Sequence, residues 1–76
     1  MVVGVTMLNV LPGKEKDVYE KIGSYEGIKD VYHVFGEFDF VVVISTETLK
    51  QLNDLVDRIR GIPDVTATQT IIGADI

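Results

Sequence analysis

Cysteine is absent from the sequence of 76 residues, and this absence excludes several kinds of site at once. Without thiols there is no disulfide framework, no cysteine nucleophile and no sulfur-ligated metal. The sequence also contains only one histidine, His33, so no histidine pair can hold a metal. A lone histidine in a strand is more often structural than catalytic. We therefore expect neither a metal site nor a cofactor.

Basic residues are scarce, with seven Lys and Arg against twelve Asp and Glu, which gives a formal net charge of −5. This sign of charge is wrong for holding phosphates, so direct binding of nucleic acid is not expected. Long apolar runs are missing too, since all of them fall far short of the ~20 residues that a membrane span requires. Because Met1 leads into a strand pattern without a basic leader, we expect a soluble, cytoplasmic protein.

Hydrophobic periodicity predicts six elements in the order βαββαβ. The predicted strands are residues 2–10, 29–35, 39–45 and 64–72. The first helix is predicted from Lys14 to Ile22, with Tyr25 adding a turn and Asp17 pairing with Lys21 at i,i+4. The second helix is predicted from the three-four spacing of Leu49, Leu52, Val56 and Ile59. Thr46 is expected to cap this helix, with Glu47 in its first turn.

The chain also repeats itself, because GIKDV (27–31) and GIPDV (61–65) match at an offset of 34 residues. Two βαβ units with right-handed crossovers predict a ferredoxin-like α+β sandwich, in which two helices cover one face of a four-stranded antiparallel sheet. One domain, residues 1–76, is expected. The glycine of each repeat is expected to allow a left-handed turn at the end of a helix.

Both faces of the predicted sheet are apolar. The first strand places Val3, Val5 and Met7 on one face and Val2, Leu8 and Val10 on the other. Two helices can cover only one face, whereas an antiparallel sheet with a wet second face should alternate between apolar and polar residues. A second copy packed sheet against sheet would cover the exposed patch, so the pattern predicts a homodimer.

A candidate ligand site lies in the segment VFGEFDF (34–40), which joins two predicted strands. Gly36 can adopt backbone conformations that are closed to other residues, and a tight turn can direct several N–H groups outward as a nest for a carboxylate. Glu37 and Asp39 could accept hydrogen bonds from an ammonium group. Asp39 is expected to have few core contacts, so that its loss should weaken binding or assembly more than folding.

Three threonines could add hydroxyl groups to this site. Thr66, Thr68 and Thr70 are expected to project from one face of the last strand at period two. Together with the turn they suit an amphoteric small molecule such as an amino acid. The alternative interpretation is purely structural, because Gly-x-x-Asp is a common turn composition and threonine favours strands for packing reasons.

The chain resembles the effector-binding domain, or RAM domain, of the Lrp/AsnC feast/famine transcription regulators. The resemblance covers essentially the whole sequence and is carried by V-x-G-x-x-D (34–39), the two GI-x-DV segments and T-x-T (68–70). It implies dimers that form through their sheets and assemble into octamers or similar rings. It also implies that an amino-acid effector binds between dimers.

By the same resemblance, Gly36, Glu37, Phe38 and Asp39 line the effector site, and the strand of Thr66, Thr68 and Thr70 contributes hydroxyls. Regulators of this family carry an N-terminal helix-turn-helix domain, whereas here Met1 immediately precedes the first strand. The resemblance therefore implies an effector domain without its own DNA-binding domain. Such a domain could sense amino acids alone, or join a full-length Lrp/AsnC regulator and alter its assembly.

Two other functions stay open at the level of sequence. Small dimeric ferredoxin-like enzymes of the cofactor-free monooxygenase type also begin with a valine-rich strand and a PGKE-like helix start. Such an enzyme needs an enclosed polar pocket, and the available residues, His33, Tyr32 and Asn9, form no recognisable catalytic group. The third possibility is a structural partner of a DNA-binding homologue that binds no ligand. We expect a non-enzymatic sensing module.

Overall fold

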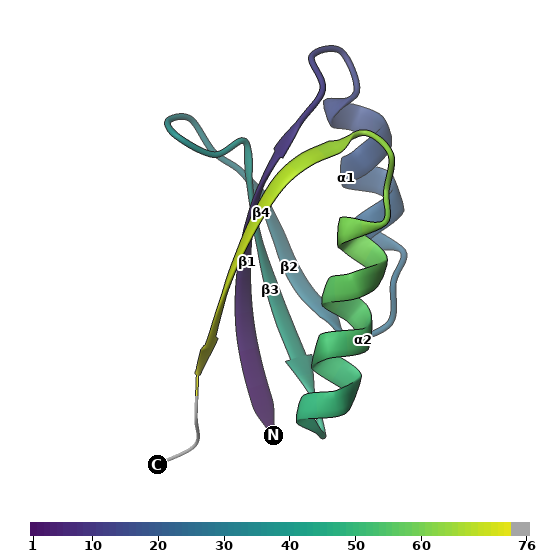
Figure 1. The fold of residues 1–76 in the computed structure, drawn as a ribbon, viewed down its shortest axis with the longest axis vertical. Helices are drawn as coiled ribbons and strands as arrows, with labels where there is room; N and C mark the ends of the chain where they lie inside the picture. The colour runs from purple at the N-terminus through teal and green to yellow at the C-terminus, as the bar shows by residue number, and fades with distance from the viewer. Residues whose placement is uncertain (74–76) are drawn as a thin grey trace.

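Four strands form one antiparallel sheet, and two helices pack against one of its faces (Figure 1). The computed structural model describes residues 1–73. In chain order the elements are β1 (Val2–Val10), α1 (Glu15–Gly23), β2 (Ile28–His33), β3 (Phe40–Thr46), α2 (Leu49–Arg60) and β4 (Val65–Gly73). The predicted βαββαβ order and ferredoxin-like fold are confirmed.

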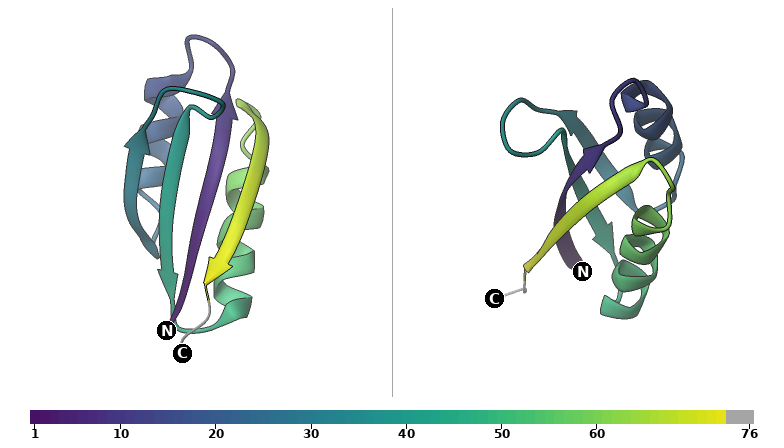
Figure 2. Two further views of the ribbon diagram at one scale, coloured as in Figure 1. Left: turned by 90° about the vertical axis from the view of Figure 1, so that its left-hand side faces the viewer. Right: turned by 45° about the horizontal axis from the view of Figure 1, so that its top comes forward.

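The strands lie in the order β2-β3-β1-β4, which places β1 at the centre between β3 and β4 (Figure 2, left). In the β1–β3 register Leu8 pairs with Phe40, and in the β1–β4 register Thr6 pairs with Thr70. The strands β2 and β4 form the two edges of the sheet. The central strand β1 therefore pairs with β3 of the β2–β3 hairpin on one edge and with β4 on the other.

The hydrophobic core lies between the sheet and the helices. Alternate residues of β1 and β3 are buried there, as expected for strands with one covered face. Each helix contributes apolar residues at three-four spacing. The core consists of Leu8, Val10, Val18, Ile22, Phe40, Val42, Ile44, Leu52, Leu55, Val56, Ile59 and Ile62.

Close packing of α2 on the sheet depends on Gly4 in β1. A Cβ atom at position 4 would lie 2.9 Å from Leu52 Cδ1, which is closer than real Cβ contacts. The missing side chain therefore lets Leu52 of α2 approach the backbone of the central strand.

The second helix begins later than the sequence predicts. Its N-cap is Thr48, whose hydroxyl accepts from the Gln51 N–H at 3.2 Å, while the Gln51 side chain accepts from the Thr48 N–H. The predictions of Thr46 as cap and Glu47 in the first turn are wrong. The physical reason is that Thr46 pairs with Val2 at the end of β3 and so stays in the sheet.

Three details of the helix ends also differ from the predictions. The helix α1 ends at Gly23, and Tyr25 follows in a turn where its N–H donates to the Ile22 carbonyl. Gly27 adopts the expected positive φ of 97°, but Gly61 does not, since its φ is −79° and its N–H still donates within α2. Within residues 1–73 the predicted Asp17–Lys21 pair is not formed. The i,i+4 ion pair is instead Lys50–Asp54.

The face of the sheet away from the helices, which we call the open face, is mainly apolar. Its apolar residues are Val3, Val5, Met7, Val41, Val43 and Ile71, and the same registers place Asn9, Ser45 and Gln69 on this face. Ile71 is 57% exposed, and no element of residues 1–73 covers this face. Neither helix in the described part of the chain is long and apolar enough to cross a membrane.

Candidate functional site

The hairpin between β2 and β3 is longer than predicted, because β2 ends at His33 and β3 begins at Phe40. Residues 34–39, which we call the 34–39 loop, project from the end of the sheet away from the helices (Figure 1). A hydrogen bond of 2.8 Å from the Val34 N–H to the Asp39 carbonyl closes the loop. Gly36 has a φ of 142°, and a Cβ there would meet no atom within 4 Å, so conformation rather than space favours glycine.

Asp39 attaches this loop to the central strand. Its Oδ2 accepts a hydrogen bond of 2.9 Å from the Val10 N–H, and its own N–H donates to the Leu8 carbonyl at 3.0 Å. These two contacts with β1 go beyond the few core contacts expected for a turn residue, while the expectation that loss of Asp39 weakens binding or assembly more than folding stays a prediction. Its Oδ1 makes no hydrogen bond within residues 1–73, so this oxygen can accept one from a ligand.

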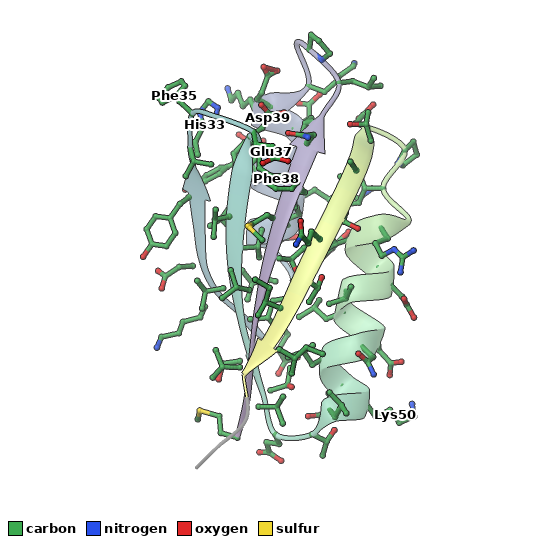
Figure 3. All side chains as sticks on the ribbon, turned by 60° about the vertical axis from the view of Figure 1, so that its left-hand side comes forward. His33, Phe35, Glu37, Phe38, Asp39 and Lys50 are labelled. Carbon is green, nitrogen blue, oxygen red and sulfur yellow. The ribbon has the colours of Figure 1, made fainter. Side chains whose placement is uncertain are left out.

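The other predicted loop residues lie beside Asp39. Glu37 is exposed and makes no ion pair within the described chain, whereas Phe38 is half-buried. Figure 3 shows Glu37, Phe38 and Asp39 near the ends of β3 and β1. The structure thus brings the four predicted residues, Gly36 to Asp39, together in one loop with two carboxylates and no basic side chain.

An aromatic row lies on the other side of the loop, where Phe35 and His33 are neighbours (Figure 3). The His33 ring is stacked on Phe40 at 4.8 Å and lies 5.3 Å from the ring of Phe35. Phe35 is 94% exposed, which the sequence did not indicate.

The residues considered for catalysis do not converge. Tyr32 pairs with Val41 and His33 with Phe40, so these neighbours in β2 lie on opposite faces of the sheet. Asn9 pairs with Ala67 on the open face, away from His33. Within residues 1–73 no group of three or more His, Asp or Glu is placed to hold a metal.

The threonines lie apart from the 34–39 loop within one chain. Thr68 and Thr70 share the helix-facing side of β4, and the Thr70 hydroxyl bonds the buried Thr6 hydroxyl at 2.9 Å. Thr66 lies where the β1–β4 register shifts, so the predicted alternation ends there. Because β1 separates β4 from β3 and the loop, the threonines and Asp39 do not line one pocket of one chain.

A groove between α2 and β4, which we call the α2–β4 groove, contains Thr68 and Thr70. It encloses about 530 Å³ and is open to solvent. Its lining is Asn53, Val56, Asp57, Arg60, Thr68, Thr70 and Ile72. Asp57 and Arg60 line this groove, but the sequence did not single them out. Their i,i+3 spacing on the polar side of α2 was the available signal, but only the topology shows that this side faces β4.

Comparison with known proteins gives one matching family. Residues 1–73 match the Lrp/AsnC ligand binding domain. The HTH-type transcriptional regulator FL11 of Pyrococcus abyssi is 38% identical over 66 residues, which are 87% of this chain and 44% of the regulator. The chain therefore spans less than half the length of this curated relative.

Solved structures with the same fold agree with this match. The crystal structure of FFRP-DM1 is 35% identical with a TM-score of 0.91, and the alignment covers 97% of this chain and 100% of that one. The hypothetical protein PHS023 from Pyrococcus horikoshii is 34% identical with a TM-score of 0.92, over 100% and 93% of the two chains. A feast or famine regulatory protein from M. tuberculosis, complexed with L-methionine, shares the fold at 23% identity and a TM-score of 0.81, over 100% of this chain and 52% of that one.

Proposed function

The chain belongs to the Lrp/AsnC ligand-binding domain family, and we propose that it senses a small amino-acid effector and assembles with other copies. In this proposal the chain catalyses no reaction. The observation that carries it is the 34–39 loop, in which Gly36 has a positive φ and Asp39 offers an unused carboxylate oxygen.

The effector binds at the loop formed by Gly36, Glu37, Phe38 and Asp39. Asp39 Oδ1 accepts a hydrogen bond from the effector's ammonium group, and a charge-assisted bond of this kind is stronger than a neutral one. Glu37 adds a second negative charge, and Phe38 offers apolar surface. The M. tuberculosis protein of this fold was solved with an amino acid, L-methionine, which supports the ligand class.

Dimers form through the open face. Val5 lies at its centre, between Val43 of β3 and Ile71 of β4. Burial of this apolar surface against a second copy removes it from water, and twofold dimers are the commonest soluble oligomers. The same face allows pairing with the corresponding domain of a full-length Lrp/AsnC regulator such as FL11, whose sequence extends beyond the matched part.

The effector site lies between dimers. Since β1 separates the loop from β4 in each chain, the hydroxyls of Thr66, Thr68 and Thr70 reach the same effector only from a neighbouring copy. Dimers that meet in this way form a heterologous contact, which closes into a ring such as an octamer when the rotation permits. The exposed Phe35 ring is available to this contact.

Titration calorimetry against each of the twenty amino acids, with sedimentation velocity on the same samples, tests the proposal. We expect heat of binding for at least one amino acid and a change of assembly when it binds. Silence from all twenty at millimolar concentration would exclude sensing. A stable monomer at micromolar concentration would exclude the sheet-to-sheet dimer.

A further inference from the structure

Methionine supplies the sulfur atoms of this chain, because the sequence holds two methionines and no cysteine. Met1 stands at the start of the chain, whereas Met7 lies in the central strand β1. A hydroperoxide can oxidise a thioether to a sulfoxide, which turns a flexible apolar side chain into a polar one. Any response of the chain to such an oxidant through sulfur therefore depends on where these two side chains lie.

Met7 belongs to the open face. It is opposite Val41 of β3 and Gln69 of β4 in the two registers of β1, and directly opposite residues share one face of a sheet. Val5, two residues earlier in the same strand, lies on the same face. Met7 therefore has apolar side chains on two sides, and it lies where the apolar part of the face meets the polar residues Asn9 and Gln69.

The Met7 side chain is only partly buried in a single copy. Its chain neighbours Thr6 and Leu8 point to the helices and are completely buried. No element of residues 1–73 covers the open face, so a molecule as small as hydrogen peroxide can reach the sulfur from that side. In the sheet-to-sheet dimer the same side chain lies in the contact, so the oxidant reacts with the free copy that is in equilibrium with the dimer.

The oxidation of Met7 needs a hydroperoxide and no other reactant. A lone pair of the sulfur attacks one oxygen of the hydroperoxide, and the S–O bond forms as the O–O bond breaks. The proton of the attacked oxygen passes to the displaced oxygen, which leaves as water or as an alcohol. Sulfur loses two electrons and the hydroperoxide gains them, so the product is methionine sulfoxide.

The added oxygen changes what the open face can pack against. A sulfoxide oxygen accepts hydrogen bonds, but Val5 and Val41 beside it carry no side-chain donor. Gln69 is exposed, and in a free copy its amide or water can donate to this oxygen. Removal of such a polar group from water against a second apolar face is unfavourable. Because a twofold dimer contains Met7 twice, the penalty applies twice.

We propose that Met7 is an oxidation site through which a hydroperoxide dissociates the dimer, and that reduction of the sulfoxide restores the dimer. The inference rests on the proposed function, since it makes the sheet-to-sheet contact respond to an oxidant. Methionine sulfoxide reductases reverse the modification, with one enzyme for each epimer at sulfur. A chain without cysteine can in this way couple its assembly to oxidation through a thioether.

Hydrogen peroxide, applied to the full chain, tests the inference. Peptide mass spectrometry measures the oxygen added to Met7 and to Met1 separately, and sedimentation velocity measures the dimer. We expect the dissociation constant of the dimer to rise about tenfold or more once Met7 is oxidised. It should return to its starting value after treatment with both sulfoxide reductases and a thiol reductant. Circular dichroism should show an unchanged fold throughout.

Met7→Leu is the matched control, because leucine keeps a similar apolar volume and has no sulfur. This variant still contains Met1, which is 76% exposed, so peroxide oxidises Met1 alone. Its dimer should persist under the same treatment. Met7→Gln places a polar amide at the same position without any oxidant, and it should weaken the dimer in the same direction as the sulfoxide does.

Three results would overturn the inference: an unchanged dissociation constant with Met7 fully oxidised, a Met7→Leu dimer that dissociates in peroxide, or dissociation that is accompanied by loss of the fold. In each of these cases the untreated protein is still a dimer, so only the inference falls and the proposed function stands. A monomer before any treatment would instead exclude the proposed dimer and the inference with it.

Discussion

The side chain of Asp39 accepts a hydrogen bond from the backbone N–H of Val10, at 2.9 Å from Oδ2 to N. This contact joins the end of the β2–β3 hairpin to the end of the central strand. One oxygen of the carboxylate thus positions the loop, while the other has no hydrogen-bond partner within residues 1–73. The Asp39 side chain therefore has a structural contact through one oxygen and a proposed ligand contact through the other. Variants of Asp39 can distinguish the two roles.

Asp39→Asn and Asp39→Ala make this separation. The amide of Asn keeps an oxygen that can accept from Val10, whereas Ala leaves that N–H without its partner, at a cost of about 1–2 kcal/mol. We expect Asp39→Ala to lower the free energy of urea unfolding by this amount and Asp39→Asn to lower it less. Both variants should lose effector binding in calorimetry, because both remove the negative charge. An Asp39→Asn protein that binds as tightly as the unchanged one would contradict the ammonium contact.

Gly36→Ala should destabilise the protein through backbone conformation alone. The φ of 142° is strained for any residue with a side chain, and the added methyl would touch nothing. A strained residue of this kind costs about 1–3 kcal/mol. Gly23→Ala is the control, because Gly23 at the end of α1 has equally free space and no positive φ. Thermal unfolding should show a lower Tm for position 36 and an unchanged or higher Tm for position 23.

Removal of the Thr6–Thr70 hydrogen bond should lower the free energy of unfolding more when Thr70 is replaced than when Thr6 is replaced. Thr70→Val leaves the hydroxyl of Thr6 buried without a partner, which costs about 1–3 kcal/mol. Thr6→Val should cost less, because Thr70 is only half-buried and its hydroxyl can reach water. The double variant should recover part of the loss, so a double-mutant cycle in urea measures the coupling. Equal costs that simply add would contradict a shared bond.

Val5→Lys should prevent dimer formation. The substitution places a charge at the centre of the open face, between Val43 and Ile71, and an unpaired charge in an apolar interface is strongly unfavourable. Glu20→Gln changes the net charge by the same amount at an exposed position of α1 and serves as control. Sedimentation velocity should find a monomer for the first variant and the unchanged assembly for the second. A Val5→Lys dimer with native unfolding would exclude the open face as the interface.

The fold could be predicted because its signals are local. The hydrophobic periods of strands and helices depend on residues that are close together in the chain. The repeated GI-x-DV segment indicated that the chain contains two βαβ units. The predictions were wrong where the structure of a residue depends on contact with a residue far away in the chain. Thr46 has a good capping side chain, but its pairing with Val2 keeps it in β3, and Thr48 caps the helix instead.

The same distinction between local and distant signals applies to the candidate site. Gly36 to Asp39 are consecutive, so their common location was visible in the sequence. Arg60 was missed, because its place beside Thr68 follows only from the packing of α2 along β4. The bond from Asp39 to Val10 was missed too, since the two residues are far apart in the chain and meet only in the sheet.

Gly4 has no side chain to separate α2 from the central strand beneath it. Because Leu52 packs where a Cβ would be, the absence of a side chain at position 4 sets how closely α2 approaches the central strand. An alanine there would place its Cβ 2.9 Å from Leu52 Cδ1, so Leu52 or the helix would have to shift. One added methyl group in β1 would thus change the packing between the two layers of the fold.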